Sequence, residues 1–140
     1  MSASPLVLFN KKMDHLFDFL MKKYPTNRDL KLSYEKFKMA KQYDPRKILE
    51  NFFQYAYPYK SKIMERDERF FLEEDIKNHI KPEMNNSMQE YGITEDYIIN
   101  KALDIKQYWG NMSEEDKNHI WNDFQTLIKL TEEYIKRMMY

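Results

Sequence analysis

The chain contains no cysteine and only two glycines among its 140 residues. Without cysteine the protein can form neither a disulfide framework nor a thiolate metal site, and it has no cysteine nucleophile. Two glycines are too few for the glycine-rich loops that cradle phosphate groups, and the Gly-x-Ser-x-Gly elbow of many hydrolases is absent. These absences argue against the usual nucleotide sites and against several kinds of nucleophilic catalysis.

Long apolar runs are missing as well. The N-terminal run over residues 6–9 has only four residues, which is too short for a signal-peptide core or for a membrane span. We therefore expect no membrane contact and a location in the cytoplasm or the nucleus. The lack of cysteine agrees with such a reducing compartment.

The composition that is present predicts a folded chain with a substantial core. Hydrophobic residues make up 42% of the sequence and aromatic residues 16%, which excludes a disordered chain despite the high content of charge. A length of 140 residues falls within the usual size of one domain. We therefore expect a single domain over residues 1–140.

The apolar residues recur mainly at spacings of three and four, and no long stretch alternates with a period of two. This pattern predicts an all-α fold, a single compact domain of six or seven helices. The expected helices cover residues 8–23, 28–43, 45–57, a short segment from 58, part of 66–80, 94–109, and 114–138. The last two should form a C-terminal αα-hairpin across residues 110–112, and residues 81–93 should be a connection.

Capping residues support several of these boundaries. Asp44 and Pro45 are expected at the N-cap and first position of the third helix. Ser113 should cap the last helix, with Asp116 completing a variant of the capping box. The middle of the apolar stripes supplies a predicted core, whose members are Phe17, Phe52, Ile105, Trp109, Phe124 and Leu127.

The residues that could carry chemistry are scattered. His15, His79 and His119 lie on separate predicted segments, and the one Asp-x-x-His spacing, Asp116 to His119, is an incomplete form of the carboxylate motif of di-metal bundles. An acidic cluster lacks the glycine turn and alternating ligands of a calcium loop; it contains Glu65, Asp67, Glu68, Glu73, Glu74 and Asp75. We expect no catalytic residue, no metal, no cofactor and no enzymatic activity.

The net charge is zero, but its distribution is uneven. Residues 1–66 contain 14 Lys and Arg against 7 Asp and Glu, whereas residues 67–140 contain 9 against 16. In the basic half, lysines alternate with aromatics, and cations with aromatic rings can bind phosphates and bases. The candidate nucleic-acid contacts are Lys31, Lys36, Lys38, Lys41, Arg46 and Lys47. The alternative, which we favour, is that Tyr34 and Phe37 point inward and the lysines form a solvated helix face.

The C-terminus ends in Met138, Met139 and Tyr140. Methionine side chains adapt to irregular surfaces, and burial at a chain end is hard to arrange within one small domain. These three residues are therefore a candidate interface for a protein partner or for a second copy of the chain.

Two segments, residues 58–75 and 109–128, resemble small helical proteins of large double-stranded DNA viruses, which mostly have no assigned function. The resemblance implies a viral origin, with the virion as a further location, and it supplies no catalytic residue. A viral origin suits the abundance of residues with AT-rich codons. The expected function is a non-enzymatic structural, assembly or host-interaction role through helical surfaces. The alternative is a nucleic-acid-associated protein that uses the basic N-terminal half.

Overall fold

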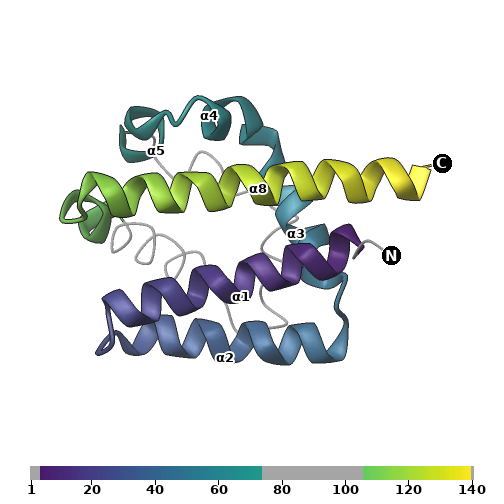
Figure 1. Ribbon diagram of the computed structural model, residues 1–140, viewed down its shortest axis with the longest axis horizontal. Helices are drawn as coiled ribbons and strands as arrows, with labels where there is room; N and C mark the ends of the chain where they lie inside the picture. The colour runs from purple at the N-terminus through teal and green to yellow at the C-terminus, as the bar shows by residue number, and fades with distance from the viewer. Residues whose placement is uncertain (1–3, 74–105, 140) are drawn as a thin grey trace. The chain divides into compact units, whose positions relative to one another are not determined.

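The computed structural model describes residues 4–73 and 106–139, and every regular element within these ranges is a helix (Figure 1). The predicted all-α fold is confirmed. Contacts divide the chain into a first unit, Met1–Arg66 with His119–Tyr140, and a second unit, Asp67–Asn118. The prediction of one domain over the whole chain stays a prediction.

Helix α1 covers Pro5–Lys23 and begins three residues before the predicted start at residue 8. The Ser4 hydroxyl accepts a hydrogen bond from the Val7 backbone N–H at 3.2 Å, and Pro5 occupies the first position of the helix. Serine at an N-cap and proline directly after it are the residues that favour a helix start. The apolar spacing alone did not reveal these residues as the cap.

Helix α2 covers Arg28–Tyr43, as predicted, and the side chain of Asn27 caps it by accepting from the Leu30 N–H at 3.0 Å. Helix α3 covers Lys47–Tyr55. The prediction of Asp44 as its N-cap and Pro45 as its first residue is wrong. Asp44 ends α2 in an extended conformation, the region that a following proline favours.

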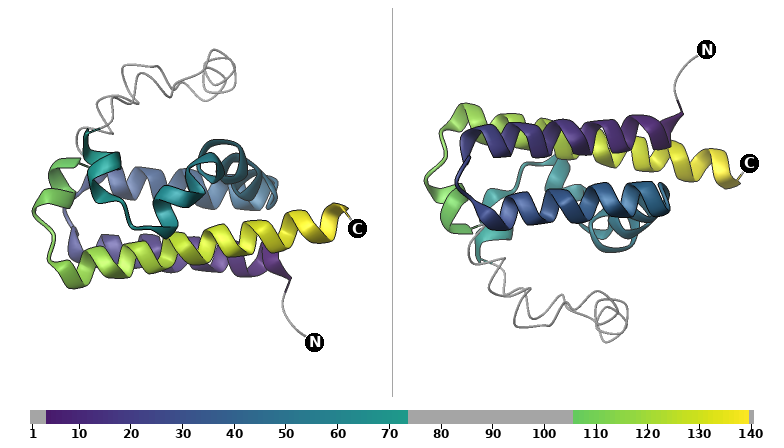
Figure 2. Two further views of the ribbon diagram at one scale, coloured as in Figure 1. Left: turned by 90° about the horizontal axis from the view of Figure 1, so that it is seen from above. Right: turned by 90° about the horizontal axis from the view of Figure 1, so that it is seen from below.

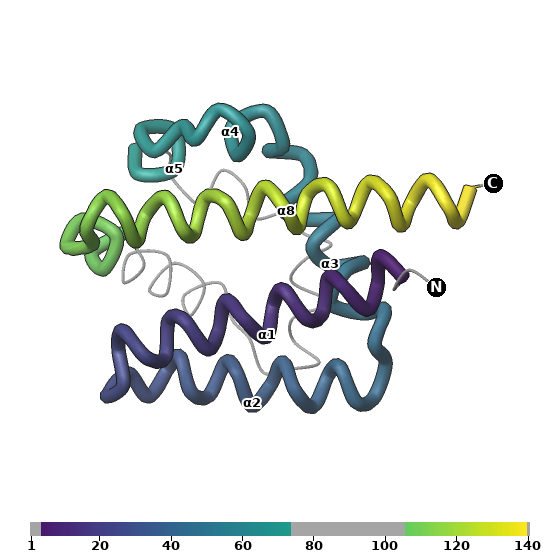
Figure 3. The backbone as a smooth tube through the Cα atoms, in the orientation of Figure 1, coloured from purple at the N-terminus to yellow at the C-terminus, as the bar shows by residue number. Residues whose placement is uncertain are grey.

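A turn over residues 45–46 separates the two helices. The Asp44 carboxylate accepts a hydrogen bond from the Arg46 N–H at 3.1 Å, and the Lys47 N–H donates to the Asp44 carbonyl at 3.1 Å. In addition, the Asn10 amide on α1 donates to the Pro45 carbonyl at 2.9 Å, which fixes this turn against α1. The tube in Figure 3 follows the chain through the turn.

Two short helices follow α3 in the first unit. The 3-10 helix η1 covers Tyr57–Tyr59 and α4 covers Lys60–Met64, close to the short helix predicted from residue 58. The amide of Gln125, on the last helix, donates to the carbonyls of Ile63 and Met64 at 3.3 and 3.1 Å. The carbonyls at the end of α4, where a helix leaves carbonyls without a partner of its own, therefore accept hydrogen bonds from the last helix.

In the second unit, α5 covers Glu68–Glu73, and residues 106–110 are helical. Residues 74–105, which include the predicted connection and most of the predicted helix over 94–109, lie outside the described ranges. Helix α8 covers Glu114–Met139. Its predicted cap is confirmed, because the Ser113 hydroxyl accepts from the Asp116 N–H at 3.1 Å.

The core of the first unit centres on three fully buried side chains, Phe9, Leu49 and Leu127, which come from α1, α3 and α8. The rings of Phe9 and Phe52 meet edge to face, with centroids 5.3 Å apart. In Figure 1, α1 lies between α8 and α2, and Figure 2 shows the start of α1 and the end of α8 at the same end of this unit.

The predicted core is partly wrong. Only Leu127 is buried, whereas Phe17, Phe52, Trp109 and Phe124 are half-buried, and Ile105 lies outside the described residues. Phe17 packs against the rings of α2 instead, with centroid distances of 5.3 Å to both Tyr34 and Phe37. The stripes show which side of each helix faces inward, but the depth of a residue depends on which helices cover it.

Candidate interaction surfaces

The inner face of α2 carries a polar cluster beside its aromatic residues. The Tyr34 hydroxyl donates to one oxygen of Asp14 on α1 at 2.8 Å, and the Lys41 ammonium donates to the other oxygen at 3.0 Å. Burial raises the pKa of Asp14, but the hydrogen bonds from Tyr34 and Lys41 outweigh it and hold this pKa below its ordinary value. The hydrogen bond to Asp14 also raises the pKa of Tyr34.

This cluster changes the interpretation of two predicted nucleic-acid contacts. Lys41 points inward to Asp14 and also lies over the Phe37 ring, with its nitrogen 5.3 Å from the centroid. Lys38 pairs with Glu35 at 3.0 Å and lies over the Tyr34 ring at 4.8 Å. Both lysines therefore serve contacts within the first unit, and Lys41 in particular is poorly placed to bind phosphate.

The other four predicted contacts are exposed, as Lys38 also is. Arg46 lies 3.6 Å from Asp44 beside the turn, Lys31 and Lys36 lie on α2, and Lys47 begins α3. The predicted inward orientation of Tyr34 and Phe37 is confirmed, since Phe37 is buried and Tyr34 half-buried. The structure thus separates the inward Lys41 from the five exposed cations of the basic segment.

The outer face of α2 carries an apolar stripe that the sequence analysis missed. Leu32, Met39 and Tyr43 are 50%, 69% and 94% exposed. With Lys36 they follow one another at intervals of four, three and four residues, which places all four on one side of a helix. We call Leu32, Met39 and Tyr43 the outer stripe. The same spacing rule that located the inner face would have found it.

The end of α8 forms a second exposed apolar surface. Met138 and Met139 are 65% and 75% exposed, and the last buried residue of the helix is Thr131. The final two turns of α8 therefore extend past the deepest part of the core. Tyr140, the third residue of the predicted C-terminal interface, lies outside the described residues.

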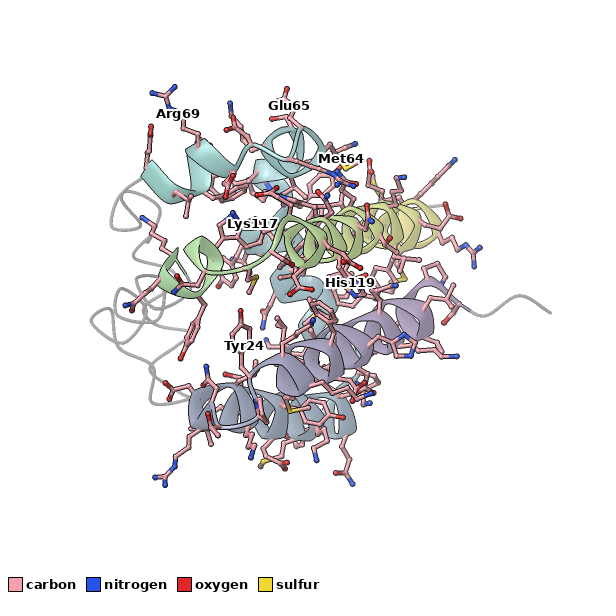
Figure 4. The ribbon with its side chains drawn as sticks, turned by 60° about the vertical axis from the view of Figure 1, so that its left-hand side comes forward. Tyr24, Met64, Glu65, Arg69, Lys117 and His119 are labelled. Carbon is pink, nitrogen blue, oxygen red and sulfur yellow. The ribbon has the colours of Figure 1, made fainter. Side chains whose placement is uncertain are left out.

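A buried carboxylate lies on the side of α8 that faces α1. Asp123 is buried, and its oxygens lie 3.4 Å from the Lys12 ammonium and 3.3 Å from His119 Nε2. His119 stacks on Phe19 of α1 with ring centroids 3.9 Å apart, and Figure 4 shows its side chain directed toward that helix. The His119 side chain is 47% exposed.

A second carboxylate cluster lies near the start of α4. Glu132 of α8 accepts from the Lys60 ammonium at 2.7 Å and from the Tyr57 hydroxyl at 3.2 Å. The hydrogen bond from Lys60 lowers the pKa of Glu132, and the same bond raises the pKa of Lys60. For Tyr57, burial and the bond to Glu132 both raise the pKa. The cluster joins two segments that are more than 70 residues apart.

In the described part of the second unit, acidic side chains form hydrogen bonds and ion pairs. Glu68 accepts from the Lys117 ammonium at 3.0 Å and from the indole N–H of Trp109. These two hydrogen bonds lower the pKa of Glu68, and the bond to Glu68 raises the pKa of Lys117. Glu73 pairs with Arg69 at 3.0 Å, while Glu74 and Asp75 lie outside the described residues.

Within residues 4–73 and 106–139, no group of three or more His, Asp or Glu side chains is arranged to hold a metal ion. His15 is exposed on α1, and His79 falls outside the described ranges. The expectation that the chain holds no metal therefore stays a prediction.

Neither a known protein family nor a curated protein or solved structure matches this chain.

Over the part of the chain that the structure describes, no helix is both long enough and apolar enough to cross a membrane. The candidate functional residues lie on exposed parts of the described helices. They are the exposed cations of α2 and α3, the outer stripe, and the methionine pair at the end of α8.

Proposed function

We propose that this chain is a non-enzymatic viral structural, assembly or host-interaction protein that acts through the surfaces of its helices. The observation that carries the proposal is the exposure of large apolar side chains on two separate helices, α2 and α8. Exposed apolar groups that follow one helix face are typical of contacts with another protein. The viral part rests on the resemblance of residues 58–75 and 109–128 to helical viral proteins.

The methionine pair at the end of α8 supplies the direct test. Tagged full-length chain, produced in infected cells, should capture a protein in near-stoichiometric amount after chemical cross-linking. Replacing Met138 and Met139 with Gln should reduce that capture, because Gln keeps the helix propensity but removes apolar contact area. Lys136→Gln, an exposed change one turn away, serves as the control.

Capture of no protein by the wild-type chain, or equal capture by all three proteins, would contradict the role of this surface. Turnover of any substrate by purified chain would contradict the non-enzymatic part of the proposal. Mass spectrometry of the captured material identifies the partner in the same experiment.

The nucleic-acid alternative is kept because Lys31, Lys36, Arg46 and Lys47 are exposed on the first unit. That unit contains 17 Lys and Arg against 10 Asp and Glu. A basic surface of this kind can bind phosphates at low salt. The contacts of Lys38 with Glu35 and of Lys41 with Asp14 weaken the alternative, although only Lys41 points inward and Lys38 is itself exposed.

A further inference from the structure

A short segment of the first unit lies along α8 on a side that the core does not use. It covers residues 57–66, which are η1, α4 and the two residues after them, and we call it the strap. In Figure 1, α4 lies on the other side of α8 from α1. Figure 4 shows Met64 and Glu65, at the end of the strap, on the opposite side of α8 from His119.

Polar contacts attach both ends of the strap to α8. Near its start, the Tyr57 hydroxyl and the Lys60 ammonium donate to Glu132 at 3.2 and 2.7 Å. Near its end, the Gln125 side chain donates to two carbonyls of α4 and accepts from Arg66 at 3.4 Å. None of these hydrogen bonds is fully buried, so water can replace each of them when the strap moves away.

The face of α8 under the strap is polar. Asn122, Gln125 and Glu132 follow one another at intervals of three and seven residues, which places them on one side of the helix. The fully buried Leu127 follows Gln125 by two residues, which is about 200° around the helix. The core therefore packs on one face of α8 and the strap on the other. Polar groups that return to water lose little free energy, because water replaces their hydrogen bonds.

The strap buries little apolar surface of its own. Among residues 57–66, Ile63 is the one buried side chain, with 5% exposure. The core, by contrast, has Phe9, Leu49 and Leu127 fully buried. Segments with few buried apolar contacts and accessible hydrogen bonds open locally at a lower free energy than the core needs to unfold.

The end of the strap has a strained backbone. Arg66 has a φ of 54°, in the left-handed region that residues other than glycine rarely adopt. Its guanidinium donates to Asn122 as well as to Gln125 on α8. Strain of this kind persists only where surrounding contacts hold it, so releasing the strap from α8 lets Arg66 relax.

We propose that the strap opens from α8 as a unit while the core formed by α1, α3 and α8 stays folded. Opening exposes the polar face of α8 together with the side chain of Ile63, so the closed and the open chain offer different surfaces to another protein. The inference goes beyond the proposed function, because the opening needs no partner and does not involve the methionine pair at the end of α8.

The test is amide hydrogen exchange of the full chain, measured by NMR over a series of low urea concentrations. The amides of Glu65 and Arg66 report on the strap, since they donate to the carbonyls of Ser61 and Ile63 at 3.0 and 3.1 Å. The slowest amides of α1 and α3 report on the core. We expect the strap amides to exchange at least about tenfold faster than these core amides, at rates that hardly depend on urea, because a local opening exposes little surface.

Three variants separate opening of the strap from unfolding of the core. Gln125→Ala removes contacts that exist only in the closed chain, so it should speed exchange of the strap amides at least about fivefold. Ile48→Val weakens the packing against the core, which the closed and open chains share. It should speed exchange of the core amides and leave the strap amides unchanged. Glu133→Ala is the control on α8, because Glu133 is exposed and pairs with Arg137 of the same helix; it should leave the strap amides unchanged.

Four results would overturn the inference. Strap amides that exchange as slowly as the core, with the same urea dependence, would mean that the strap opens only when the whole unit unfolds. Equal acceleration of strap and core by Ile48→Val would mean the same. No response of the strap to Gln125→Ala would show that its contacts with α8 do not hold it closed, and strap amides without any protection would show that it is never closed.

Discussion

Three carboxylates of the first unit join helices in the same way, each bound by a lysine from another helix. Asp14 binds Lys41, Asp123 lies beside Lys12, and Glu132 binds Lys60; the distances are 3.0, 3.4 and 2.7 Å. Two of the carboxylates also accept a tyrosine hydroxyl. A charged pair with an added hydrogen bond fixes the relative position of two helices more specifically than apolar contact does.

The Asp14 cluster predicts how stability depends on pH. The folded-state pKa of Asp14 lies below its ordinary value of 3.8, so the unfolded chain binds this proton more readily. The stabilisation by Asp14 is therefore complete above about pH 4 and is lost as the pH falls through the folded-state pKa. In urea denaturation, the stability difference between the wild-type chain and Asp14→Asn should shrink over this acid range.

Asp18→Asn is the matched control, because Asp18 lies one turn further along α1 and pairs with Lys22 at the surface. Exposed pairs contribute little to stability. If Asp14→Asn behaved as Asp18→Asn does at every pH, the contacts of Asp14 with Tyr34 and Lys41 would not stabilise the fold.

Burial reverses the expectation for two phenylalanines, because Phe124 is a member of the predicted core and Phe9 is not. Phe9 is fully buried between α1, α3 and α8, whereas Phe124 is half-buried at the edge of the same core. Phe9→Ala should lower the free energy of unfolding by about 3–5 kcal/mol, the usual range for a buried phenylalanine. Phe124→Ala should cost less, and chemical denaturation measures both. Equal costs would mean that Phe124 is as deeply packed as Phe9.

At the scale of the elements, the positions of the helices could be predicted from the sequence, but most contacts between helices could not. The boundaries of α2 follow from Asn27 and from the extended residue before Pro45, which are local signals. The pair of Tyr34 with Asp14 and the bond from Asn10 to Pro45 join segments 20 and 35 residues apart. Periodicity identifies the inward face of a helix but not its partner, so these contacts and the depth of each core residue could not be predicted.

The candidate surfaces divide in the same way, into features of a single helix that could be predicted and contacts between helices that could not. Exposure of Lys31, Lys36, Arg46 and Lys47 could be predicted from their place on a polar helix face, and so could the free end of α8. The engagement of Lys41 with Asp14 could not, because it needs the position of α1 relative to α2. The outer stripe was predictable in principle, because Leu32, Met39 and Tyr43 follow the same spacing rule as the inward face of α2.

The start of α8 gives a prediction for a single element. The Ser113 hydroxyl satisfies the N–H of Asp116, and three acidic residues follow in the first turn of the helix. Ser113→Ala should destabilise the protein by about 0.5–2 kcal/mol, while Ser113→Asp should keep most of the stability. Thermal and chemical denaturation measure the loss. Ser33→Ala, an exposed change within α2, is the control and should be nearly neutral.

For the whole molecule, the division of charge coincides with the division into units. Residues 119–140 belong to the first unit and carry three Lys and Arg against three Asp and Glu, so they leave its net charge at +7. The imbalance seen along the sequence is therefore an imbalance between two compact units. Salt screens the attraction between such charges beyond about 10 Å at 0.1 M and beyond about 30 Å at 0.01 M.

The last prediction decides whether the exposed lysines of α2 in the first unit contact another protein or nucleic acid. Replacing Lys31 and Lys36 with Gln removes two exposed charges beside the outer stripe and leaves the inward contact of Lys41 with Asp14 intact. Replacing Lys129 and Lys136, two exposed lysines of α8, removes the same charge elsewhere. If copies of the chain bind one another through α2, the first variant should associate more weakly than the second at low salt, and the difference should fade as salt screens the charges.

Binding of duplex DNA, measured on the same samples, should be weak and should respond equally to both variants. Unchanged association together with a large loss of DNA affinity in the first variant alone would instead assign the basic surface to nucleic acid, and no change in either measurement would leave it as solvated surface.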